Sequence, residues 1–225
     1  MSGARQGQRR AETYRTVADL PGLVPIFPLA GALLLPRGRL PLNIFEPRYL
    51  AMVNDALAGE RTIAMVQPSP CPATGGPAPD LYRVGCLGRI TQFSETGDGR
   101  YLITLTGICR FRIGDEPEAA TPYRQVIPEY GDFVRDLAED SGDILDRPRF
   151  LKALNAYLVA NKLDADWGSI EGAPAESLVN TLAMLLPFEP QEKQALLQAP
   201  GLTERADALL ALLELAAAGQ AGGMN

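Results

Sequence analysis

The spacing of apolar residues changes within one short stretch, Pro25–Leu57. Apolar and polar or proline positions alternate over Leu40–Ile44, which predicts a strand with one buried face. Pro47 then opens a helical pattern, because the N–H that proline lacks would be unpaired in a first helical turn. Gly59 predicts where that helix ends. The stretch therefore predicts a strand followed directly by a helix.

Two longer apolar runs, Leu81–Ser94 and Arg100–Ile113, are separated by an Asp-Gly turn. Asp-Gly between alternating runs indicates a β-hairpin. Threonines alternate with apolar residues in the second run, so we expect both of its faces to be partly covered, as in a small barrel. Further strands are predicted at Arg61–Gln67 and Tyr123–Tyr130, where Pro128 favours a place at a sheet edge. Together these runs predict a β-rich part.

Helical spacing replaces the strand pattern after about residue 131. Thr203 is expected to be the N-cap of the last helix. Short connections between helices predict antiparallel neighbours in a small bundle. The polar residues 1–19 are expected to form a disordered tail and residues 220–225 a frayed end. The predicted helices are Arg147–Asn161, Pro174–Leu186, Pro190–Gln198 and Thr203–Ala218.

The segments PIFPL and LPRGRLPLNIFEPRYLAMV resemble the N-terminal substrate-binding domain of Lon proteases. Val84–Ile113, with its Gly-x-x-Arg-Phe ending, and Ser177–Leu213 are similar to later parts of that domain. The resemblance implies an α+β fold, with a PUA-like, mostly antiparallel β-barrel and inserted helix over residues 20–130 and a C-terminal helical bundle over residues 131–219. The motif residues are Glu46, Pro47, Arg48, Tyr49, Gly107, Arg110 and Phe111.

The resemblance also implies a function. It predicts a non-catalytic, stand-alone module that binds unfolded or exposed polypeptide segments, as an adaptor or regulator beside a protease or chaperone, with homo-oligomers as a further option. A binder of unfolded chains needs exposed apolar side chains. The candidates are Phe27, Phe93, Tyr123 and Phe133, although each is also a typical core residue.

Histidine is absent, which removes Ser-His-Asp triads and the common histidine zinc sites. None of the lysines, Lys152, Lys162 and Lys193, follows a glycine, so no Walker A loop is recognisable. We expect all three on solvated helix surfaces. The ATPase and Ser–Lys peptidase parts of full-length Lon find no counterpart, so the sequence predicts no enzyme, no cofactor and no metal.

The three cysteines are an odd number at wide spacings, which favours a reducing, cytoplasmic compartment. Cys86 and Cys109 fall in predicted strands, where they are either buried free thiols or a pair across the hairpin. No apolar run approaches the roughly 20 residues that a membrane-spanning helix needs.

RNA binding is the alternative function, because PUA-like barrels in other families bind RNA. Arginines beside aromatic residues can hold phosphate and stack bases. Against this, residues 131–225 carry seven basic and fifteen acidic residues, and such a part repels phosphate. Nucleic acid is therefore the less favoured partner. The arginines concerned are Arg83, Arg89, Arg100, Arg110, Arg112 and Arg124.

Glu46 stands at the predicted junction of strand and helix. Its carboxylate is expected to cap the helix, because the dipole and free N–H groups there favour negative charge. Arg110 is a hypothetical ion-pair partner for Glu46, which would join the hairpin to the first helix.

Overall fold

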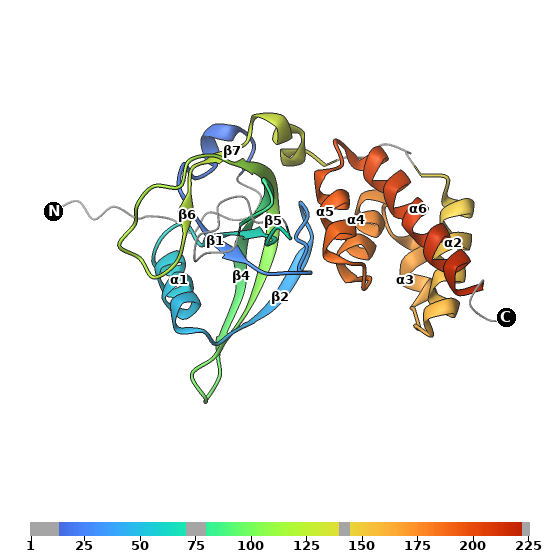
Figure 1. The fold of residues 1–225 in the computed structure, drawn as a ribbon, viewed down its shortest axis with the longest axis horizontal. Helices are drawn as coiled ribbons and strands as arrows, with labels where there is room; N and C mark the ends of the chain where they lie inside the picture. Colours follow the sequence, from blue (N-terminus) through green and yellow to red (C-terminus); the bar gives the residue numbers. More distant parts are fainter. Residues whose placement is uncertain (1–13, 71–79, 140–144, 222–225) are drawn as a thin grey trace.

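The computed structural model describes residues 14–70, 80–139 and 145–221, without the side chains of 219–221. A strand-rich part and a helical part lie side by side along the long axis of the molecule (Figure 1). The strands are β1 (Val24–Pro28), β2 (Arg39–Ile44), β3 (Thr62–Val66), β4 (Val84–Glu95), β5 (Tyr101–Ile113), β6 (Gln125–Val126) and β7 (Pro128–Glu129). The helices are η2 (Val17–Asp19), α1 (Pro47–Ala58), η3 (Gly131–Leu137), α2 (Arg147–Asn161), α3 (Trp167–Gly172), α4 (Ala175–Leu185), α5 (Pro190–Gln198) and α6 (Leu202–Ala221).

The strands form one sheet in the order β2-β5-β4-β3-β1-β6, with β7 paired to the end of β5. The β1–β3 pair is parallel and the others are antiparallel, so the sheet is mostly antiparallel as predicted. Helix α1 is inserted between β2 and β3. Within the described residues β2 and β6 each pair on one side only. The fold is therefore α+β with a mixed sheet, and closure of that sheet into a barrel is not seen.

The β4–β5 hairpin, with β2 beside it, extends beyond the other strands of the sheet (Figure 1). Strand β3 pairs with β4 only as far as Arg89, so beyond that point the hairpin has β2 on one side and, among the residues that the structure describes, no strand on the other. We call β2, residues 90–95 and residues 101–106 the arm. Ile103 and Leu105 are buried, whereas the preceding Leu102 is 47% exposed. The expectation that both faces of this run are partly covered is met at Thr104 and Thr106, which are half-buried, but not at Leu102.

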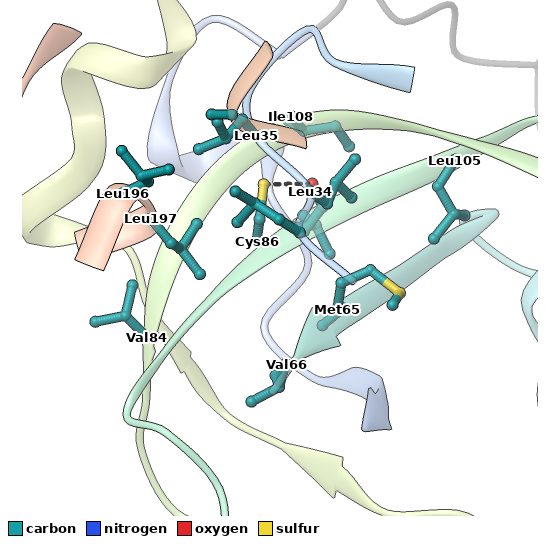
Figure 2. Close-up of a cluster of buried hydrophobic side chains, with 14 of the residues drawn as sticks. Leu34, Leu35, Met65, Val66, Val84, Cys86, Leu105, Ile108, Leu196 and Leu197 are labelled. Atoms are coloured by element: carbon teal, nitrogen blue, oxygen red, sulfur yellow. Dashed lines mark hydrogen bonds between the residues drawn. The ribbon is translucent and has the colours of Figure 1, made fainter. Parts of the chain in front are cut away.

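Strands and helices share one apolar core. Leu196 and Leu197 of α5 lie against Val84 and Cys86 of β4 in the cluster of Figure 2. The run of leucines before β2 is buried as well, although it is not a strand. Its Leu35 passes so close to β5 that the chain needs glycine at position 107, because a Cβ there would overlap the Leu35 carbonyl oxygen. The helical part is thus packed on the sheet.

Most predicted elements are present, with three differences. Tyr123–Tyr130 divides into β6 and β7 on either side of Ile127. Helix α6 begins at Leu202, so Thr203 lies inside it and is not its N-cap. Helix α3 was not predicted, because six residues are too few to display a period.

Part of the predicted N-terminal tail is described. Arg89 Nη1 donates to the buried hydroxyl of Tyr14 at 3.2 Å, and η2 follows. The rest of that tail, most of the proline-rich loop with Cys71, part of the acidic linker and most of the C-terminal tail lie outside the described residues; these are residues 1–13, 71–79, 140–144 and 222–225.

Candidate functional site

Arg110 of the Gly-x-x-Arg-Phe motif joins the sheet to the helices. Its Nε and Nη2 each donate to the Asp136 carboxylate at 2.8 Å, and its Nη1 donates to the Leu197 carbonyl at 3.0 Å. The remaining donations reach the carbonyls of Ala199 and Pro200, between α5 and α6. The hypothesis that Arg110 pairs with Glu46 is therefore wrong, because a nearer carboxylate on η3 takes both ends of the guanidinium.

Glu46 instead accepts from Arg48, at 2.9 Å from Nε. It occupies the N-cap position of α1, but its side chain makes no capping hydrogen bond, so that part of the expectation is also wrong. The Arg48 guanidinium lies 4.5 Å from the centre of the Tyr49 ring, which itself packs on Phe27. The Glu46–Tyr49 motif thus braces the start of α1.

Two further buried side chains hold the helices on the sheet. Lys193 donates to the carbonyls of Gly31 at 3.0 Å and Met184 at 3.2 Å, and burial lowers its pKa. The prediction that this lysine is solvated is wrong, whereas Lys152 and Lys162 are exposed. Gln194 donates to the carbonyl of Val84 at 3.1 Å. These hydrogen bonds satisfy backbone carbonyl groups that the packing of helices on the sheet shields from water.

Arg205 of α6 is buried at the same junction. Its Nη1 donates to Asn180 Oδ1 at 3.0 Å, and Asn180 Nδ2 donates to the Pro36 carbonyl at 3.2 Å. Burial, followed by the nearby Arg110 charge, lowers the pKa of Arg205 to about 10. Its Nη2 has no hydrogen-bond partner among the described residues. The junction is therefore extensively hydrogen-bonded but not fully satisfied.

Cys86 and Cys109 are buried free thiols, which confirms one of the two predicted states. The alternative of a pair across the hairpin is wrong, since Cys86 lies opposite Arg110 and Cys109 lies opposite Leu87. Burial and the Asp136 charge raise the pKa of both thiols, that of Cys109 to about 12. Neither is activated as a nucleophile.

The four predicted contact residues lie in different places. Phe27, Tyr123 and Phe133 are buried, and the Tyr123 hydroxyl donates to Asp55 at 2.7 Å. Phe133 packs beneath the Arg110 guanidinium, 4.7 Å away. Phe93 alone of the four is exposed, at 43%. The structure therefore does not bring them together on one surface.

Phe93 borders a shallow hollow of about 780 Å³ on the arm. Not one of its ten lining residues is charged, although 21% of the chain is charged. The sequence did not indicate that Leu102 is exposed, because its alternation with threonine is as consistent with a covered face as with an exposed one. We call this site the arm hollow. Its lining residues are Pro41, Leu42, Asn43, Thr91, Gln92, Phe93, Ser94, Leu102, Ile103 and Thr104.

Hydrogen bonds hold the side chains of Thr91, Gln92 and Thr104 in the arm hollow. The Thr104 hydroxyl donates to Gln92 Oε1 at 2.8 Å, and the Thr91 hydroxyl donates to the Thr104 carbonyl at 3.2 Å. The Phe93 ring meets Tyr101 edge to face, with 5.0 Å between ring centres. The surface is therefore pre-arranged, apolar in part and without charge, which suits an uncharged ligand.

Two other hollows are lined by ion pairs. One of about 640 Å³ lies beside α1, where Arg124 donates to Glu116. Another of about 270 Å³ lies at the junction, where Arg37 donates to Glu176. A ligand in either would compete with an existing ion pair. Within the described ranges no three cysteine, aspartate or glutamate side chains gather as a metal site.

The arginines that suggested RNA binding are mostly engaged. Arg89 and Arg110 are buried, and Arg100, Arg112 and Arg124 pair with Asp98, Asp132 and Glu116. Five of the six arginines are thus buried or paired with a carboxylate. No helix in the described part of the chain combines the length and apolar character needed to cross a membrane.

Comparison with known proteins finds relatives among the Lon proteases. The chain is 27% identical to a Lon protease of Syntrophus aciditrophicus over 191 residues, which is 82% of this chain and 21% of that protein. A Lon protease of Anaeromyxobacter dehalogenans is 30% identical over 95 residues, 42% of this chain and 11% of that protein. The chain thus spans less than a quarter of the length of these relatives.

Solved structures support the fold. The N-terminal domain of a Mycobacterium avium complex Lon protease is 17% identical with a TM-score of 0.60, over 87% of this chain and 98% of that one. A Lon N-terminal domain protein from Xanthomonas campestris is 24% identical with a TM-score of 0.56, over 84% and 97%. The model of the ATP-dependent protease La (LON) substrate-binding domain matches residues 23–214. With sequence and fold in agreement over most of its length, the chain belongs to the LON substrate-binding domain family.

Proposed function

We propose that this chain is a polypeptide-recognition module that holds exposed, uncharged segments of client proteins in the arm hollow. The observation that carries the proposal is that Leu102 and Phe93, both exposed, line the arm hollow, whose lining residues carry no charge. The family model describes a substrate-binding domain, which supports polypeptides as the class of ligand.

The arm hollow is suited to weak, reversible binding. Burying one leucine or phenylalanine side chain stabilises by about 1.5–3 kcal/mol. Two or three such contacts, reduced by the cost of ordering an extended chain, correspond to dissociation constants on the order of micromolar or weaker. Such affinity suits a module that passes clients on.

We further propose a non-catalytic role as an adaptor or regulator, with a protease or chaperone as partner. The named relatives are Lon proteases, which supports a link to proteolysis. Incubation with ATP and a client should leave both intact. Cleavage of the client that one point substitution abolishes would contradict this role.

A binding experiment tests the client proposal. Fluorescein-labelled, reduced and carboxymethylated α-lactalbumin, which stays unfolded, is titrated with the protein, and anisotropy is measured. Leu102→Asp should weaken binding at least about tenfold, because a carboxylate would be desolvated in the complex. Leu215→Asp is the matched control, since Leu215 is 69% exposed and belongs to α6, a helix in the part of the molecule away from the arm (Figure 1). Equal loss in both variants, or no binding by the wild type, would overturn the proposal.

A further inference from the structure

The arm has two strand edges, and their free backbone groups follow from the hydrogen-bond register. The Thr96 N–H donates to the Arg100 carbonyl at 2.9 Å, so Thr96 directs its N–H across the hairpin. In an antiparallel ladder, bonded and non-bonded pairs alternate. Ser94 opposite Leu102 is then bonded, whereas Phe93 and Glu95 direct their N–H and C=O groups away from β5.

The same alternation shows which residues of β2 direct their backbone groups to its free edge. Residues 101, 103 and 105 of β5 bond to β2, through Ile44, Leu42 and Leu40. Arg39, Pro41 and Asn43 therefore face outward. Pro41 has no N–H, and proline at an outward position is a known means of preventing further strands from pairing. The β2 edge is thus blocked at its centre.

The β4 edge has no such block. All five residues from Thr91 to Glu95 are exposed. On this side of β4, the last backbone hydrogen bond of the described residues runs from the Ile90 N–H to the Arg61 carbonyl, at 2.7 Å. Beyond it, the outward groups of Phe93 and Glu95 have no backbone partner in the described part of the chain. The hairpin also projects away from the body, so another chain could reach this edge (Figure 1).

We propose that a client segment in extended conformation adds to the arm as a further strand, alongside β4 at Phe93 and Glu95. This inference rests on the proposed function and assigns its mode. Main-chain pairing accepts many sequences, since every residue except proline offers the same donor and acceptor. The clients are therefore extended segments without proline at the paired positions.

Phe93 supplies the side-chain preference. Directly opposite residues on neighbouring strands place their Cβ atoms about 4.5–5.5 Å apart. The client residue opposite Phe93 would contact its ring, which Tyr101 already orients. We expect an aromatic or β-branched residue there, because such pairs stabilise neighbouring strands.

Amide hydrogen exchange, measured by NMR, tests this assignment directly. In the free protein the Phe93 and Glu95 amides should exchange rapidly, while the Ser94 amide is protected by its bond to β5. Saturation with carboxymethylated α-lactalbumin should slow exchange at Phe93 and Glu95 at least about tenfold and change Ser94 little. Binding without added protection at Phe93 and Glu95 would overturn strand addition but leave the proposed function standing.

Two further outcomes also contradict the proposal. Protection of both amides in the free monomer would mean that another part of this chain occupies the edge. Protection that appears only as protein concentration rises, together with a doubled mass, would mean that a second copy occupies it. Absence of any binding would instead refute the proposed function itself.

A variant pair provides an independent measurement. Glu95→Pro removes an outward N–H without removing a bond to β5, and Glu95→Val keeps that N–H. The probe is a fluorescein-labelled ten-residue peptide of alternating valine and threonine flanked by lysines. Glu95→Pro should weaken binding roughly fivefold relative to Glu95→Val, as expected for one backbone hydrogen bond. If Glu95→Pro does not fold, the wild-type protein is titrated instead with the same peptide N-methylated at alternate residues. Equal affinity for the methylated and unmethylated peptides would contradict the proposal.

Discussion

Arg110 and Arg112 stand two positions apart on β5 and pair with Asp136 and Asp132 of η3 at very different depths. The side chains of the Arg110 pair are 3% and 9% exposed, and those of the Arg112 pair are 51% and 59% exposed. Breaking a buried pair leaves a charge without compensation, whereas exposed pairs contribute little. Arg110→Met should therefore lower the free energy of unfolding in urea by about 3–5 kcal/mol, and Arg112→Met by less than about 1 kcal/mol.

The partner of Arg110 can be verified by double mutants. The effects of Arg110→Met and Asp136→Leu on the free energy of unfolding should be strongly coupled, because either single change leaves the other charge buried without a partner. Arg110→Met and Glu46→Gln should be additive, because Glu46 bonds to Arg48. Coupling of Arg110 to Glu46 rather than to Asp136 would contradict the structure.

The buried thiols predict a pH dependence of stability. The pKa of Cys109 is raised from its ordinary value of 9.0 to about 12, so between these values the folded state keeps a proton that the unfolded state loses. The folded state then binds more protons, and the free energy of unfolding falls as pH rises from about 9 towards 12. Below about pH 9 this contribution is fully present. Urea unfolding at pH 8 and pH 10.5 measures it, and Cys86→Ala with Cys109→Ala should lose less stability than the wild type. The same loss in both would refute the assignment.

The sequence identified Arg110 as a motif residue but not its partner. Asp136 lies in an acidic segment whose composition is typical of a linker, and no local pattern distinguishes it from the neighbouring aspartates. Three of the four aromatic candidates turned out to be core residues for a related reason. An apolar side chain is equally consistent with core and with binding surface until the packing around it is known.

Among the elements, the hairpin and most helices follow from local patterns. The Asp-Gly turn and the period-2 runs define β4 and β5, and proline and glycine punctuate α1, α2, α4 and α5. A strand was predicted at Tyr123–Tyr130, but its division into β6 and β7 could not be predicted, because it depends on pairing with β1 and β5 rather than on the local sequence. The exposure of Leu102 was missed for the same reason, since burial is decided by neighbouring elements.

Gly107 tests how closely the leucine run before β2 packs on β5. A Cβ at this position would overlap the Leu35 carbonyl, which is backbone and cannot move aside. Gly107→Ala should lower the midpoint of thermal unfolding by about 8 °C or more, equivalent to roughly 2–3 kcal/mol. Gly97→Ala, where nothing lies within 4 Å of the added carbon, is the control. An equally small change in both variants would contradict the described packing.

At the scale of the molecule, an acidic helical part is fixed to a sheet whose projecting arm is neutral. Client binding to the arm hollow should therefore change less than about twofold between 50 mM and 500 mM salt, because few charges take part. Binding of RNA through phosphate contacts would weaken by orders of magnitude over the same range. Anisotropy titrations with carboxymethylated α-lactalbumin and with a single-stranded RNA distinguish the two. A steep salt dependence for the client would place its contact elsewhere than on the arm.

The most direct measurement of the central claim is site-specific crosslinking. A photoreactive phenylalanine analogue replaces Leu102 in the arm hollow or, as the control, Leu215 on α6, both of which are exposed. After illumination with carboxymethylated α-lactalbumin, the account predicts a covalent client adduct from position 102 and little from position 215. Adducts from position 215 and none from position 102, in a folded protein that binds the client, would contradict it.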